Sequence, residues 1–123
     1  MKSTLNNYRQ SPRKVRLVAN AIKGKRVAQA DAVLSFMPKR AAEPIQKLVR
    51  SAVANAKAQG VSEENLVVKN VEVNKGTVMK RWMPRAQGRA TPINKRSSHV
   101  DVTLVEVAPK IKAAPRKKPE AKN

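Results

Sequence analysis

The sequence predicts an α+β fold in which three helices pack on a small antiparallel sheet and a long extended β-hairpin arm projects from that sheet. Apolar residues recur at helical spacing in the first half of the 123-residue chain, and beyond Ser62 they alternate as in β-strands. More than twenty residues with little core-forming content separate two alternating segments. We therefore expect one domain over residues 1–108, which includes the arm at about 76–98, and a basic, disordered tail over 109–123.

The first two helices are marked by their boundaries and by their apolar spacing. The first is expected to begin at Ser11-Pro12, an N-cap residue followed by a proline at the first helical position, and to end at Gly24. The second is shorter and ends at Pro38. Residues spaced by three and four positions are expected to face the core: Val15, Val18, Ala19 and Ile22 in the first helix, and Val27, Ala30, Leu34 and Met37 in the second.

The third helix is the longest and is expected to run from about Lys39 to Gln59. Gly60 follows its C-terminus, and Pro44 lies in its first turns, where a missing N–H is tolerated. Its inner stripe is expected to contain Ala41, Ile45, Leu48, Ala52 and Ala56.

Two later segments have the two-residue period of strands, Leu66 to Val73 and His99 to Val107. Because two strands alone make a poor sheet, the weakly patterned segment from Ser3 to Arg9 is expected to add a third. In the last strand, Val100, Val102 and Leu104 are expected on the core face.

The charge of the chain indicates a polyanionic partner. Lys and Arg number 27 against 8 Asp and Glu, a formal net charge of +19 that opposes compaction by self-repulsion unless it is neutralised. There are no cysteines and one histidine, His99, which is expected to form a hydrogen bond at a strand end. No apolar run approaches the ~20 residues of a membrane span, so we expect a cytoplasmic protein without membrane insertion.

The positive charge is concentrated in three segments. Residues 1–26 contain eight basic residues and no acid, residues 75–96 contain seven and no acid, and residues 109–123 contain six and one acid. Residues 27–74 are nearly balanced, with six basic and five acidic residues. This distribution favours phosphate binding over a merely solvated charged surface.

The acid-free segment between the two strands predicts the hairpin arm. Its turn is expected at Arg85-Ala86-Gln87-Gly88, and twelve residues from Gly76 to Gly88 give it a reach of roughly 40 Å. A lone two-stranded ribbon with like charges on both strands is marginal in water. We therefore expect the arm to become ordered against a polyanion that surrounds it.

Four motifs in this order resemble the family of the bacterial-type large-subunit ribosomal protein L-twenty-two: SPRKVRLVA at 11–19, SAVANA at 51–56, MKRWMPRAQGRA at 79–90 and KRSSHV at 95–100. The resemblance implies an α+β body on the large-subunit RNA and a hairpin that lines the nascent-peptide exit tunnel and supports subunit assembly. It assigns the tunnel wall to the tip residues Gln87, Gly88, Arg89 and Ala90.

Charge and resemblance together predict a structural constituent of the large ribosomal subunit, without enzymatic activity, cofactor, bound metal or homo-oligomer. The expected partners are large-subunit ribosomal RNA (rRNA), neighbouring ribosomal proteins and the nascent peptide at the hairpin tip. The residues expected to bind rRNA are Arg9, Arg13, Lys14, Arg16, Lys80, Arg81, Arg85, Arg89, Lys95 and Arg96.

Three other classes of protein fit the sequence less well. A DNA-compacting protein also uses basic ribbon arms, but its arm tips carry apolar wedges, whereas this tip is Gln87, Gly88 and Arg89. A membrane-active protein requires basic amphipathic helices, and the strongest basic segment here is not helical. An RNA-modifying enzyme requires an acid/base constellation, which the motifs do not supply.

Three arm residues differ from the usual pattern of the resembling family. Thr77 stands where a proline is common, Trp82 where an aliphatic residue is usual, and Pro92 where a basic residue is common. Pro92 lacks an N–H and is expected to break the strand pairing locally. Trp82 is equally compatible with stacking on an RNA base and with packing against the arm itself or a neighbouring protein group.

Overall fold

The computed structural model describes residues 1–107; the tail predicted over 109–123 lies outside them. The structure contains three helices, α1 (Pro12–Ile22), α2 (Val27–Phe36) and α3 (Ala42–Ala58), and five strands. The strands are β1 (Lys2–Tyr8), β2 (Leu66–Lys75), β3 (Met79–Pro84), β4 (Ala90–Lys95) and β5 (Ser98–Glu106), and short 3-10 turns span Glu63–Asn65 and Ala86–Gly88.

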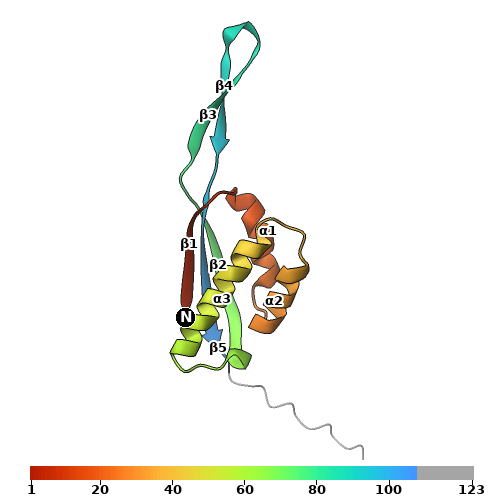
Figure 1. Ribbon diagram of the computed structural model, residues 1–123, viewed down its shortest axis with the longest axis vertical. Helices are drawn as coiled ribbons and strands as arrows, with labels where there is room; N and C mark the ends of the chain where they lie inside the picture. The colour runs from red at the N-terminus through yellow and green to blue at the C-terminus, as the bar shows by residue number, and fades with distance from the viewer. Residues whose placement is uncertain (108–123) are drawn as a thin grey trace, which may run out of the picture.

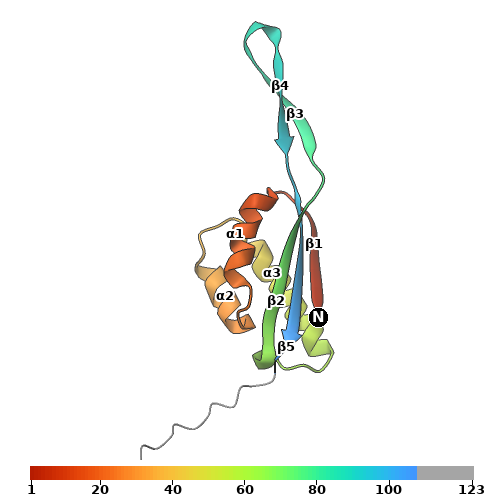
Figure 2. The same ribbon diagram turned by 180° about the vertical axis from the view of Figure 1, so that it is seen from behind.

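The strands form two separate antiparallel sheets. One has the order β1-β5-β2, and the other is the β3-β4 hairpin. The helices lie on one face of the three-stranded sheet, and the hairpin extends away from its end (Figure 1). From behind, β2 and β5 pass in front of α3 (Figure 2). The predicted α+β fold with a hairpin arm is confirmed.

The core lies between the helices and the covered face of the sheet. The predicted inner residues of all three helices are buried, apart from Met37, which is only partly buried just beyond α2. In β5, Val100, Val102 and Leu104 are buried and alternate with partly exposed residues, as the two-residue period predicts. Among the described residues, no helix combines the length and the apolar composition of a membrane span.

The predicted start of α1 is confirmed in position but not in chemistry. Ser11 is the N-cap residue and Pro12 follows it, yet the Ser11 hydroxyl makes no capping hydrogen bond. The Ser11 carbonyl accepts hydrogen bonds from the amides of Lys14 (3.1 Å) and Val15 (3.2 Å). The N-terminus of α1 therefore has no side-chain cap of its own.

The start of α3 differs from the prediction by three residues. Pro44 has no N–H to donate to the carbonyl of Arg40, so the helical hydrogen bonds cannot begin there. The first one runs from the Ile45 amide to the Ala41 carbonyl, at 3.2 Å. The freed Arg40 carbonyl accepts a hydrogen bond from the Tyr8 hydroxyl at 3.4 Å, which ties the loop before α3 to the end of β1.

The other end of α3 matches the prediction. Gly60 has a φ of 81° and follows the C-cap residue Gln59. The Gly60 amide donates to the Lys57 carbonyl (3.0 Å), and the Val61 amide donates to the Ala56 carbonyl (3.1 Å). These two bonds form a Schellman motif, which satisfies carbonyls that the helix end leaves free.

The predicted role of His99 is confirmed. The pairing of β1 with β5 is irregular between Leu5 and Tyr8, where Asn7 has a φ of 54°. The Asn7 amide donates to Nδ1 of His99 at 3.1 Å. The His99 imidazole thus accepts the hydrogen bond of a backbone amide where the pairing of β1 with β5 is irregular.

The arm joins the body through a close contact between two backbone segments. The Gly76 amide donates to the Ser97 carbonyl at 2.9 Å, and the Ser97 hydroxyl donates to the Thr77 carbonyl at 2.6 Å. A Cβ at position 76 would lie 2.7 Å from the Ser97 hydroxyl and 3.2 Å from its carbonyl carbon. Any larger residue at position 76 would therefore force Ser97 to shift.

The arm is continuously paired from Met79–Lys95 to Pro84–Ala90, so the expected break at Pro92 is wrong. Pro92 is paired with Trp82, two positions from the Pro84–Ala90 pair. Hydrogen-bonded and non-hydrogen-bonded pairs alternate along an antiparallel ladder, so pairs two positions apart are of the same type. Both prolines therefore lie in non-hydrogen-bonded pairs, which need no N–H. The turn lies where it was expected, with Gln87 at φ 60° and Gly88 at φ 68°.

Gly76→Ala is expected to lower the free energy of unfolding by about 1–3 kcal/mol, the usual cost of an added methyl group in a filled space. The new Cβ displaces the Ser97 hydroxyl and weakens its bond to Thr77. Urea unfolding of the full chain measures the loss. Thr77→Ala, which adds no atom near Ser97, is the control. Equal stability of Gly76→Ala and wild type would contradict the close approach.

Candidate nucleic-acid interface

A hollow of about 800 Å³ lies where the arm meets the body, and we call it the junction hollow. Five of its lining residues are cations and none is acidic. The residues that line it are Arg9, Gln10, Ser11, Lys14, Arg40, Asn94, Lys95 and Arg96. The hollow is therefore a concave, positively charged surface that fits an anion.

Four segments far apart in the sequence build the junction hollow. They are the residues after β1, the first turn of α1, the loop before α3, and the end of β4 with the residue that follows it. The start of α1 borders the hollow through Ser11 and Lys14. Because the helix macrodipole places partial positive charge at its N-terminus, α1 adds to the attraction for anions.

Four of the predicted rRNA-binding residues meet in this hollow: Arg9, Lys14, Lys95 and Arg96. Sequence reasoning missed a fifth cation, Arg40, because residues 27–74 are nearly balanced in charge. The basic pair Lys39-Arg40 in a loop between two helices was the available signal. Its place beside Asn94 and Lys95 in the hollow depends on tertiary structure, so the signal alone was not enough to find it.

Two predicted residues of α1 lie outside the hollow. Arg13 is exposed in the first turn. Arg16 donates to the carbonyl of Val73 from Nε at 3.3 Å and from Nη2 at 3.0 Å. Arg16 thus ties α1 to β2 through two of its donors, a structural role that the sequence did not indicate.

The remaining predicted cations lie on the arm and are exposed: Lys80, Arg81, Arg85 and Arg89. Arg85 donates to the Thr91 hydroxyl at 3.4 Å across the hairpin, and Arg81 donates to the Lys80 carbonyl at 2.9 Å. All tip residues from 86 to 90 are exposed, including the four that the resemblance assigned to a tunnel wall. None of these four lines the junction hollow, whose cation Lys95 belongs to β4 of the same arm.

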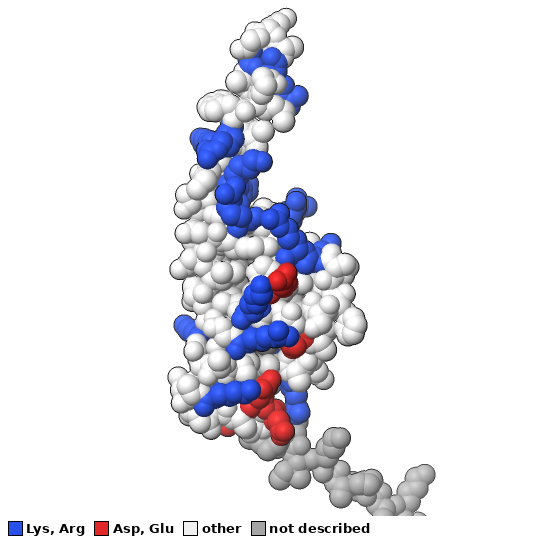
Figure 3. Space-filling view, viewed as in Figure 1, with Lys and Arg blue, Asp and Glu red and all other residues white. Residues whose placement is uncertain are grey.

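Within residues 1–107, acidic residues are confined to the body. Figure 3 shows Lys and Arg along the arm and at its junction with the body, and Asp and Glu only lower on the body. The three ion pairs within residues 1–107 are Lys47–Glu43 at 2.8 Å, Arg50–Asp31 at 3.0 Å and Lys57–Glu63 at 2.7 Å. None of these pairs includes a cation of the junction hollow or of the arm.

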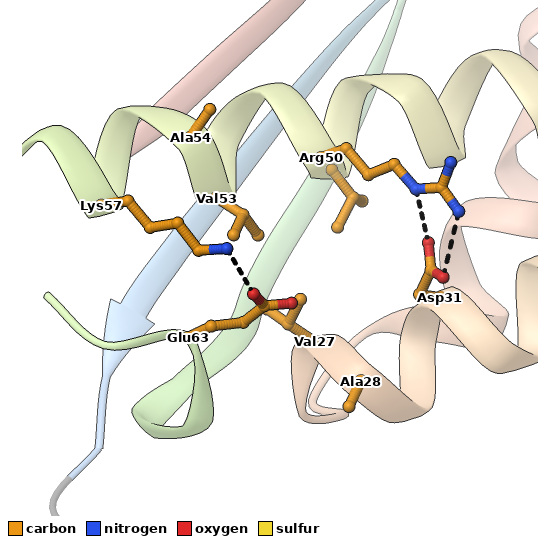
Figure 4. A pocket seen from close by; sticks show the side chains of 9 residues that line it. Val27, Ala28, Asp31, Arg50, Val53, Ala54, Lys57 and Glu63 are labelled. Atoms are coloured by element: carbon orange, nitrogen blue, oxygen red, sulfur yellow. Dashed lines mark hydrogen bonds and ion pairs between the residues drawn. The ribbon is translucent and has the colours of Figure 1, made fainter.

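A second hollow, of about 420 Å³, lies between α2 and α3 and differs in character (Figure 4). Val27 and Val53 line it, and the Arg50–Asp31 and Lys57–Glu63 pairs cross it. The hydrogen bond from Arg50 lowers the pKa of Asp31. Both cations of this hollow are thus already paired with carboxylates. It is therefore a poorer anion site than the junction hollow.

A helix-covered sheet with an acid-free cationic hollow and a cationic β-arm is the arrangement of a nucleic-acid-binding protein, since guanidinium and ammonium groups suit phosphates. Comparison with known protein families gives the particular family. Residues 3–105 match the family described as Ribosomal protein L22p/L17e, and the chain belongs to this family. It is a structural constituent of the large ribosomal subunit that binds rRNA and neighbouring ribosomal proteins.

Arg40→Ala is expected to weaken binding of the full chain to large-subunit rRNA and to reduce the slope of log K against log salt by about one, because one phosphate contact is lost. Lys47→Ala, which removes an ion-paired cation from the body, is the matched control and should leave the slope unchanged. Filter binding over a series of salt concentrations measures both slopes. Equal slopes for the two variants would contradict a phosphate contact in the junction hollow.

Asp31→Asn is expected to lower the Tm at about pH 7 and to have no effect at about pH 2. Arg50 lowers the pKa of Asp31 below its value in the unfolded chain, about 3.9. The stabilisation is therefore present above that value and is lost as the pH falls through the folded pKa. The change is small because the pair is exposed to solvent. Circular dichroism melts measure it.

Glu64→Gln removes an acid that forms no ion pair within residues 1–107 and serves as the control. A Tm deficit of Asp31→Asn that stays the same at both pH values would contradict the ion-pair explanation.

Proposed function

We propose that the junction hollow and the arm act as one continuous RNA-binding surface. The hollow binds phosphates where the body rests on rRNA, and the arm passes between RNA segments that would otherwise repel one another. The observation that carries this proposal is the arm itself. Its strands carry no acid, and every residue of β3 and β4 is exposed except Ile93, which is partly exposed.

Electrostatics supports this assignment of roles. Each cation that neutralises a phosphate releases condensed counterions, a gain that does not depend on base sequence. Arginine adds planar, bidentate donation to phosphate oxygens, and lysine adds a compact point charge. The hollow offers both types, so it suits the irregular backbone of a folded RNA.

The hairpin tip is proposed to line the nascent-peptide exit tunnel through Gln87, Gly88, Arg89 and Ala90. These residues lie at the far end of the arm from the body (Figure 1) and are exposed. Their turn is narrow because Gln87 and Gly88 both have left-handed backbone conformations. A slender tip can reach a confined passage without filling it.

In this proposal the chain works in the cytoplasm as a single copy in each large subunit, without catalysis, cofactor or membrane insertion. The interface residues support a binding role, because guanidinium and ammonium groups donate hydrogen bonds and supply charge but do not take up a proton at neutral pH. The expected contribution to subunit assembly follows from cross-linking separate RNA segments.

A photoreactive amino acid at position 89 is expected to capture the nascent peptide in ribosomes that carry a stalled chain, because the tip faces the peptide's path. The same residue at position 72, on β2 of the body, is the matched control and should capture no peptide. Mass spectrometry of the crosslinked species measures the outcome. Capture of RNA alone at position 89 would contradict tunnel lining and leave RNA binding intact.

A further inference from the structure

The two faces of the arm differ in chemistry. Facing residues of an antiparallel pair, and residues two apart along a strand, project from the same face. One face therefore carries Lys80, Trp82, Pro84, Ala90, Pro92 and Asn94, and we call it the Trp82 face. The opposite face carries Met79, Arg81, Met83, Thr91, Ile93 and Lys95.

Trp82 and Pro92 form an apolar platform in the middle of the Trp82 face. They are directly paired. Because Pro92 has no N–H to donate, theirs is a non-hydrogen-bonded pair, in which facing side chains lie closest. Their Cβ atoms are expected about 4.5–5.5 Å apart. The indole nevertheless remains 66% exposed. The arm therefore holds the Trp82 side chain beside Pro92 and leaves it exposed.

We propose that this platform stacks an unpaired nucleobase of the large-subunit rRNA. The inference deepens the RNA-binding role proposed for the arm and rests on it. The indole and the proline ring supply an apolar surface for the base, Lys80 supplies charge for a neighbouring phosphate, and Asn94 supplies an amide for the edge of the base.

The flanking pair supports a nucleotide as the ligand. Lys80 is paired with Asn94, and this pair lies two positions from Trp82–Pro92 on the same face, roughly 7 Å along the strands. A lysine side chain spans that distance, so a base on the platform and a phosphate at Lys80 can belong to the same strand of RNA. The asparagine amide both donates and accepts, as the edge of a base requires.

Charge complementarity favours RNA over a protein as the occupant. Residues 75–96 carry seven cations and no acid, so the platform lies in a strongly positive field. The π-faces of bases stack on aromatic side chains irrespective of sequence, and RNA brings the phosphates that this field attracts. A protein segment would need a high density of acidic residues to be attracted equally.

Trp82 is the only tryptophan of the chain, so its fluorescence reports on the platform alone. On titration of the full chain with large-subunit rRNA, we expect the emission to be quenched and the indole to become protected from acrylamide. Trp82→Leu is expected to weaken RNA binding by about five-fold to one hundred-fold at matched salt. Trp82→Phe should retain most of the affinity, because it keeps an aromatic face.

Met83→Leu is the matched control, since it changes an exposed apolar residue on the opposite face and should leave the affinity unchanged. Unchanged emission on RNA binding, together with wild-type affinity of Trp82→Leu, would overturn base stacking while the RNA-binding role stands. Capture of nascent peptide in place of RNA by a photoreactive residue at position 82 of assembled subunits would also overturn it. Failure of the wild-type chain to bind rRNA would contradict the RNA-binding arm itself.

Discussion

Uncompensated positive charge on the arm and at its base is the constraint on which the rest of the structure depends. The three ion pairs of the described chain lie in the body and involve α3. All charged residues of the junction hollow and of the arm strands are cations. Like charges on both strands oppose pairing of the hairpin, and a two-stranded ribbon has no core to offset that repulsion. The arm is thus built to be stabilised by a ligand that surrounds it with negative charge.

The body supplies what such an arm needs, a fixed base and a fixed direction. Three helices bury one face of the β1-β5-β2 sheet, and the arm leaves the end of β2 and returns into β5 through the contact of Gly76 with Ser97. The Tyr8 hydroxyl and the carbonyl of Arg40 tie the loop before α3 to β1, so Arg40 lies beside the cations of the hollow. The same core that gives the body its stability therefore positions the junction hollow against the start of the arm.

Apolar periodicity was enough to predict the helices and the strands β2 and β5, because these depend on local pattern. The hairpin was predicted from the length of the acid-free segment and from turn residues such as Gly88, and β1 from the need for a third strand. The start of α3 was missed because the effect of Pro44 falls on the carbonyl four residues earlier, at Arg40. Arg16 was predicted only as a cation, and its bond to the Val73 carbonyl depends on how α1 packs on β2. In the hollow, Arg40 was missed because its nearness to Lys95 comes from segments that are distant in the sequence.

Amide hydrogen exchange of the full chain, free and bound to large-subunit rRNA, tests the central claim that the arm is stabilised by its polyanionic ligand. The account predicts that, in the free protein, the amides of β3 and β4 exchange rapidly while those of Val100, Val102 and Leu104 in β5 are protected. On RNA binding, the arm amides should become strongly protected. Protection of the arm in the free protein equal to that of β5, with no change on RNA binding, would contradict the account.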